Sequence, residues 1–150
     1  MPVNNVRILA FAGSTREESL NRKLARAAAD GVRAAGAEAT LVELRELPMP
    51  LYDADLHQRE GFPGNVRAFR ALVAGHDGLL IATPEYNHGI SAVLKNALDW
   101  ASRREGTEPT GALFRGKPAL MFSAAPGIYG GVQALVHLRE VLAALGLFVL

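Results

Sequence analysis

Apolar residues occur along this chain in two alternating arrangements, short runs and stripes with helical spacing. The first run, residues 6–13, is mostly apolar, which is typical of a strand buried on both faces of a parallel sheet. Further strands are predicted at 37–44, 76–83, 117–124 and 147–150. The hydrophobic pattern therefore predicts a sheet of five strands.

Amphipathic stripes separate these runs and predict helices at 20–36, 65–75, 90–101 and 132–146. The clearest stripe consists of Ile90, Val93, Leu94, Ala97, Leu98 and Ala101. Residues 45–64 contain three prolines and two glycines without a clear period, so we expect a long loop there. Strands that alternate with helices indicate an α/β fold with a parallel sheet and right-handed crossovers.

The end of the predicted pattern is unusual, because the apolar strand 147–150 is not followed by a helix. A doubly wound sheet normally needs helices on both faces. Either the pattern lacks a C-terminal helix, or a partner chain covers the face of the sheet that such a helix would cover. The sequence leaves both readings open. We expect residues 1–150 to form a single domain, because this length suffices for one core.

The amino-acid composition excludes several classes of binding partner and several kinds of chemistry for this protein. The net charge is +1, so the totals predict no nucleic-acid or membrane partner. The chain has no cysteine, which excludes disulfides, thiolate metal ligands and a cysteine nucleophile. Its apolar runs are shorter than the roughly 18 residues that span a bilayer, and its N-terminus does not resemble a secretory signal. We therefore expect a soluble cytoplasmic protein.

Three loops of unusual composition follow predicted strands, at residues 13–21, 83–89 and 123–131. Ligands of open parallel sheets bind outside the carboxyl ends of the strands, at a topological switch point. Because all strands of a parallel sheet end at the same edge, the three loops should meet there. Their convergence predicts a binding site more strongly than any one loop does.

The first loop, "GSTREESLN", combines short hydrogen-bonding side chains with the charged Arg16 and leads into a helix. The free N–H groups and the dipole of a helix N-terminus favour an anion, so this loop predicts a phosphate cradle. It lacks the lysine of a Walker motif and the glycine pattern of a dinucleotide fold. The alternative is a capped helix with a solvated arginine.

The second loop, "TPEYNHG", is rich in polar groups and suits recognition of a flat heterocycle by backbone groups, with Tyr86 packing nearby. The alternative is an ordinary turn between strand and helix. The third loop, "SAAPGIYGG", contains three glycines and lets the backbone approach a ligand closely. Simple flexibility explains that glycine content equally well. The sequence offers no paired ligands for a metal ion.

Taken together, these motifs resemble the NADPH-dependent FMN reductase family. The matching stretches are "GSTREESLN", "TPEYNHGISAVLKNALDWAS" and "SAAPGIYGG", and "PLYDAD" followed by "EGFP" is similar to the chromate and quinone reductase branch. The resemblance extends over residues 6–150. It implies a flavodoxin-like, doubly wound sheet of order 2-1-3-4-5 with helices on both faces, in which FMN binds at the switch point.

The resemblance also implies which residues bind FMN. The residues implied to hold the phosphate are Ser14, Arg16, Ser19, Leu20 and Asn21, with Leu20 acting through its backbone. Those implied to line the isoalloxazine are Pro84, Glu85, Tyr86 and Asn87, largely through backbone groups. Ser123 and Gly127 are implied to close the other side of the cofactor. The third loop departs from the family pattern at Ala125 and Pro126.

The implied activity is a ping-pong reaction. NADPH or NADH passes hydride to flavin N5 and leaves, and a small-molecule acceptor then uses the same face. Quinones, free flavins, azo compounds and metal oxyanions such as chromate all suit an open flavin face. The flavin carries the chemistry, so the resemblance implies no catalytic side chain. It also implies a homodimer or homotetramer. An electron-transfer flavodoxin and a non-catalytic flavin-binding module are the alternative readings.

Overall fold

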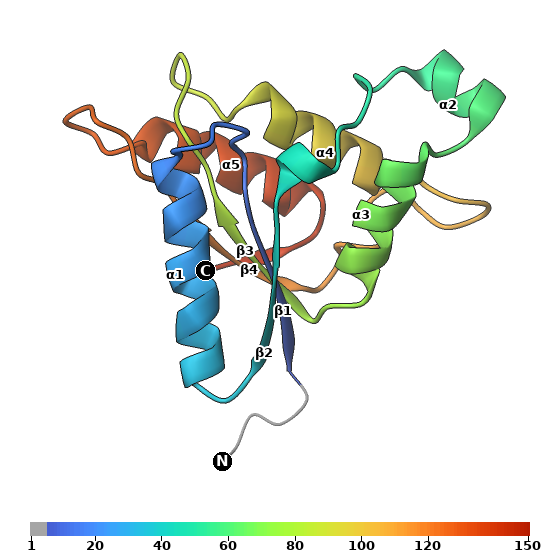
Figure 1. Cartoon of the computed structure of the whole chain (residues 1–150). Coiled ribbons are helices and arrows are strands. Elements are labelled where there is room, and N and C mark those ends of the chain that lie inside the picture. Colours follow the sequence, from blue (N-terminus) through green and yellow to red (C-terminus); the bar gives the residue numbers. More distant parts are fainter. Residues whose placement is uncertain (1–5) are drawn as a thin grey trace.

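A computed structural model describes residues 6–150, in which strands and helices alternate along the chain (Figure 1). The five strands are β1 (Arg7–Ala12), β2 (Glu38–Val42), β3 (Gly78–Ala82), β4 (Pro118–Phe122) and β5 (Phe148–Val149). They form one parallel sheet of order β2-β1-β3-β4-β5. The predicted order 2-1-3-4-5 is confirmed, and it places the reversal of winding between β1 and β3.

Five α-helices connect the strands. They are α1 (Leu20–Ala34), α2 (Ala54–Glu60), α3 (Gly64–Ala74), α4 (Ala92–Ser102) and α5 (Val132–Ala144), and a 3₁₀ turn covers Leu44–Glu46. Hydroxyl caps define where two of them start: Ser19 caps α1 and Ser91 caps α4. Helix α4 therefore begins after Ile90, which is buried ahead of it. None of the helices within residues 6–150 is long and apolar enough to cross a membrane.

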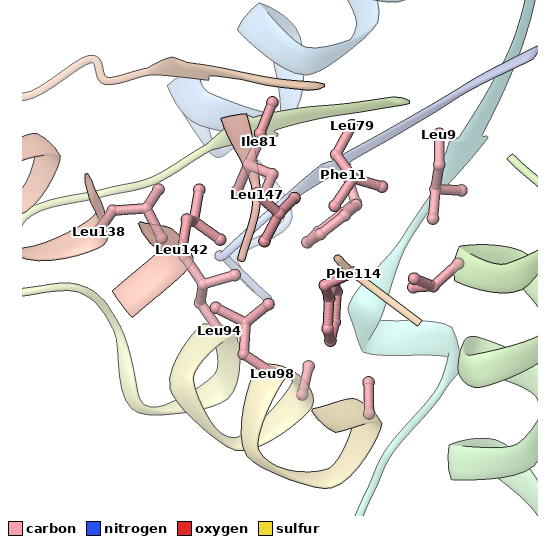
Figure 2. Packing of buried hydrophobic residues seen from close by; sticks show 14 of the residues in the cluster. Leu9, Phe11, Leu79, Ile81, Leu94, Leu98, Phe114, Leu138, Leu142 and Leu147 are labelled. Atoms are coloured by element: carbon pink, nitrogen blue, oxygen red, sulfur yellow. The ribbon is translucent and has the colours of Figure 1, made fainter. Parts of the chain in front are cut away.

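The main core lies between the sheet and the helices α3, α4 and α5. Figure 2 shows side chains of β1 and β3 pointing toward those of α4 and α5. Phe11 of β1 and Phe69 of α3 meet edge-to-face with ring centroids 5.4 Å apart. Both are fully buried, and burial of such large side chains contributes about 1.5–3 kcal/mol each. This core fixes the sheet from which the functional loops leave.

The opposite face of the sheet is covered by α1 through a smaller core of Ala12, Ala25 and Ala82. Beside α1, an apolar groove runs over the strands and is lined by Ile8, Val32, Gly78, Leu79, Leu80, Pro118, Ala119, Leu120 and Leu150. Leu120 of β4 and Phe148 of β5 are exposed along this side. This face of the sheet, over which a further helix or a partner chain was expected, is therefore apolar. No helix follows β5 in the described part of the chain.

Helix α2 was not predicted, because it lies inside the stretch 45–64 that lacks a clear hydrophobic period. Asp53 caps it by accepting hydrogen bonds from the N–H groups of Asp55 and Leu56, at 2.8 and 3.2 Å. The helix is anchored by an aromatic cluster rather than by an apolar stripe. His57 of α2 lies 4.4 Å from the Phe62 ring and 5.7 Å from the Trp100 ring, between centroids.

Candidate functional site

The carboxyl ends of β1, β3 and β4 lie side by side, and three loops leave from them. Beyond the strands, the Gly13 N–H donates to the carbonyl of Ala82 at 2.8 Å, and the Thr83 N–H donates to that of Phe122 at 2.9 Å. These bonds extend the sheet ladder by one residue on each side of β3. The three loops that were expected to share one edge of the sheet therefore do share it.

A cleft between these loops collects most of the predicted binding residues. Eight of the eleven line it together: Ser14, Arg16, Ser19, Leu20, Asn21, Pro84, Glu85 and Tyr86. Ala124, Ala125 and Pro126 of the third loop complete the lining. The other three predicted residues, Asn87, Ser123 and Gly127, flank the lining residues in sequence without being part of the lining.

The first loop places two serine hydroxyls and an arginine around the N-terminus of α1. The Ser19 hydroxyl accepts from the Arg22 N–H at 3.3 Å, and the Ser14 hydroxyl accepts from the Arg16 N–H at 3.4 Å. Ser14 and Ser19 are buried, whereas Arg16 is exposed. Within residues 6–150 its guanidinium has no side-chain hydrogen bond or ion pair, so its charge is free to meet an anion at the helix end.

Arg22, which sequence reasoning did not select, shapes this loop. Its Nη1 donates to the carbonyls of Arg16 and Glu17 at 3.0 and 2.7 Å, and its Nε donates to Glu43 at 2.6 Å. The hydrogen bond that Arg22 donates to the Glu43 carboxylate raises the pKa of Arg22. The partner carboxylate follows β2, 21 residues along the chain. Nothing in the local sequence distinguishes Arg22 from Arg16.

Asn21 joins the first loop to the third. Its Nδ2 donates to the carbonyl of Ala124 and its Oδ1 accepts from the Ala124 N–H, both at 2.9 Å. Asn21 is 3% exposed. The side-chain amide thus connects two segments that are 103 residues apart in sequence, a use that the family motif did not predict.

The second loop closes in a tight turn. Tyr86 and Gly89 exchange two backbone hydrogen bonds of 3.0 Å, so Asn87 and His88 occupy the corner. These two residues have φ angles of 51° and 62°, the left-handed geometry of a type I′ turn. Such angles are uncommon outside glycine and cost most residues about 1–2 kcal/mol, although asparagine and histidine adopt them more often than other residues. Strain of this kind is concentrated at functional sites in proteins.

Replacing His88 with glycine is expected to leave turnover within a few fold of the wild type and to raise the free energy of unfolding by up to about 1 kcal/mol. Glycine adopts the left-handed angle without a steric penalty, and the His88 side chain is 80% exposed. Urea unfolding and turnover with NADPH, the reductant that the family resemblance implies, would measure both effects. His88→Ala is the matched control, because it removes the ring and keeps the strain. A turnover loss above about a hundredfold, the scale of acid–base catalysis, would contradict this expectation.

The third loop is held by its first residue and its last glycine. The Ser123 hydroxyl donates to the carbonyl of Thr83 at 2.7 Å, which fixes the loop to the end of β3. Gly131 has a φ angle of 89°, and a Cβ atom there would lie 1.9 Å from the Ser123 Oγ. Between them, Ile128 and Tyr129 are 92% and 68% exposed. The ends of this loop are therefore fixed, while its tip faces solvent.

Known proteins show where this arrangement belongs. A sequence model of the NADPH-dependent FMN reductase family matches residues 6–150. The chain belongs to this family. The quinone reductase of Escherichia coli K12 is 36% identical over 149 residues, which cover 97% of this chain and 73% of that protein. An NAD(P)H-dependent FMN reductase of Pseudomonas aeruginosa is 39% identical over 139 residues, 93% of this chain and 70% of that protein.

A solved structure of the same kind is FerB of Paracoccus denitrificans, a flavoenzyme NAD(P)H:(acceptor) oxidoreductase. The two structures superpose with a TM-score of 0.79 at 29% sequence identity. The superposition covers 97% of this chain and 75% of the FerB chain. As a member of the family, the chain is an oxidoreductase enzyme, with FMN as its cofactor and NAD(P)H as its reductant. The predicted family, cofactor and enzyme class are confirmed.

Proposed function

We propose that the cleft between the three loops binds FMN and that the enzyme reduces quinones at the expense of NADPH or NADH. The observation that carries this proposal is the cleft itself, which unites the predicted phosphate-binding and ring-binding residues in one lining. Several related proteins are named quinone reductases or NADPH:quinone oxidoreductases. Free flavins, azo compounds and metal oxyanions such as chromate are further proposed acceptors.

The donor set of the cleft fits the two ends of FMN. At one end, the hydroxyls of Ser14 and Ser19 and the guanidinium of Arg16 surround the N-terminus of α1, as a phosphate requires. At the other end, Pro84 and Tyr86 provide flat apolar surface and backbone groups for a ring. When bound, FMN supplies hydride acceptance at N5 and delivery of the electrons to the acceptor in a ping-pong cycle.

In this proposal the chain's own residues bind and orient, and no side chain serves as an acid or base. His88 is exposed, and its Nδ1 lies 4.0 Å from Oε1 of Glu85. We also propose a homodimer or homotetramer, which size-exclusion chromatography with light scattering would test.

Anaerobic titration of the FMN-loaded protein with NADPH, followed by a panel of acceptors, tests the function. Flavin that is not bleached by NADPH or NADH would overturn it.

Replacing Arg16 with alanine is expected to weaken FMN binding about tenfold or more, because a hydrogen bond to a charged group contributes about 1.5–3 kcal/mol. Binding of riboflavin, which lacks the phosphate, should change less than twofold. Fluorescence titration of both flavins measures the difference. Arg26→Ala is a control, since Arg26 is a largely exposed arginine of α1 whose one ion pair within residues 6–150 is with Glu43, at 3.8 Å. Equal losses for FMN and riboflavin would contradict the phosphate cradle.

A further inference from the structure

Helix α5 begins without a capping side chain of its own. Its N-cap is Gly131, which has a φ angle of 89° and no side-chain hydrogen bond to the helix. The carboxylate of Glu85 takes this place from another loop: its Oε2 accepts from the Ala134 N–H at 3.0 Å. Ala134 is the third residue of α5, where a capping oxygen normally binds, and the negative charge suits the positive end of the helix.

A second contact lies five residues further along the same loop. The Ile90 N–H donates to Nδ1 of His137 in α5 at 3.3 Å. Gly89 packs against the same ring, since a Cβ atom at that position would lie 3.1 Å from Nδ1. Helix α5 therefore contacts the tight turn on both sides of its strained corner.

The Glu85 side chain is held by its hydrogen bond from the Ala134 N–H and does not extend freely into the cleft. It is 17% exposed, and its other oxygen lies 4.0 Å from Nδ1 of the exposed His88. Strained turns persist only where their surroundings over-determine them. The bonds from Glu85 and His137 supply that constraint for Asn87 and His88.

We propose that Glu85 is a positioning residue whose carboxylate fixes the ring-binding turn to α5, so that the two walls of the cleft hold the flavin ring in one geometry. One wall is the turn that follows β3, and the other is the loop that leads into α5. The carboxylate links the first wall directly to the helix that follows the second, and the His137 ring provides the other side-chain link to that helix. This inference rests on the proposed function, which puts the flavin in the cleft.

The test compares the wild type with Glu85→Ala and Glu85→Gln. Glu85→Ala is expected to raise the FMN dissociation constant about tenfold, the scale of one lost hydrogen bond to a charged group. It should also change the visible circular dichroism of FMN at saturation, because the ring environment is no longer fixed. Glu85→Gln keeps an oxygen acceptor and should stay within about fivefold of the wild type, with the wild-type spectrum.

Asp53→Ala is the matched control, because Asp53 is the acidic cap of α2 and does not line the cleft. It should lower thermal stability and leave the dissociation constant and the visible spectrum unchanged. If Glu85→Ala binds FMN within twofold and with the wild-type spectrum, the inference is overturned. A wild type that does not bind FMN would instead overturn the proposed function.

The His137 contact keeps the inference testable if Glu85→Ala does not fold. His137→Leu removes the acceptor for the Ile90 N–H, whereas His137→Asn offers an oxygen near the position of Nδ1. We expect His137→Leu to weaken FMN binding and alter its visible spectrum, and His137→Asn to restore both. Identical flavin properties in the two variants would overturn the inference.

Discussion

Asn21→Ala is expected to lower the affinity for FMN about a hundredfold and to reduce the free energy of unfolding by about 2–4 kcal/mol. The substitution deletes two hydrogen bonds of 2.9 Å and leaves both backbone groups of Ala124 without their partner. The first and third loops would then be ordered only when the cofactor binds. Ordering costs about 1–2 kcal/mol per residue, and about 2.7 kcal/mol corresponds to a hundredfold in affinity.

Fluorescence titration with FMN and urea unfolding of the apoprotein would measure these two effects. Asn96→Ala is a matched control, because the Asn96 amide also bonds two backbone groups, the Tyr52 N–H and the carbonyl of Pro50. It lies outside the lining of the cleft. The control should lose stability to a similar extent and keep its FMN affinity. Equal FMN affinity in Asn21→Ala and the wild type would show that the link between the loops does not matter for binding.

Gly131→Ala is expected to weaken FMN binding by a comparable factor, because the added methyl group displaces the side chain that holds the third loop. The new Cβ would lie 1.9 Å from Oγ and 2.7 Å from Cβ of Ser123. Ser123 would have to give up its hydrogen bond to the carbonyl of Thr83. Alanine would also be forced into the left-handed region, at an additional cost of about 1–2 kcal/mol.

Gly106→Ala separates these two causes. Gly106 has a φ angle of 64°, but nothing lies within 4 Å of the position that its Cβ would occupy. This control should show the backbone cost in urea unfolding and leave FMN binding unchanged. Adding Ser123→Gly to Gly131→Ala removes the clash and should recover part of the affinity. If the double variant binds FMN no better than Gly131→Ala, the lost hydrogen bond of Ser123 and not the clash itself accounts for the weaker binding. Wild-type FMN affinity in Gly131→Ala would contradict the prediction.

The sheet and the location of the cleft could be predicted because both depend on patterns that are continuous in sequence. Each run of apolar residues specified one strand, and the polar loops at 13–21 and 83–89 followed two of them directly. Helix α2 escaped prediction because its seven residues are held by an aromatic cluster with Trp100, 43 residues further on than His57. A hydrophobic period cannot report such a contact.

The roles of single residues were harder to predict than their membership of the site. Asn21 and Glu85 were selected as cofactor-binding residues, and both line the cleft. Their side chains, however, bond backbone groups 103 and 49 residues away. Arg22 was passed over although it supports the first loop through Glu43. Long-range partners of this kind follow from the strand order and not from the local motif.

The hydrogen bonds that link the loops of the cleft join residues that are synthesised at different times. The strand order puts β1 between β2 and β3, and the backbone that Asn21 holds, at Ala124, follows β4 near the end of the described chain. On a ribosome, Asn21 emerges early and remains without its partner until Ala124 has been translated, and Glu85 remains without its partner until Ala134 has been translated. The two links that hold the loops of the cleft therefore form only after the segments that follow β4 and begin α5 have been made.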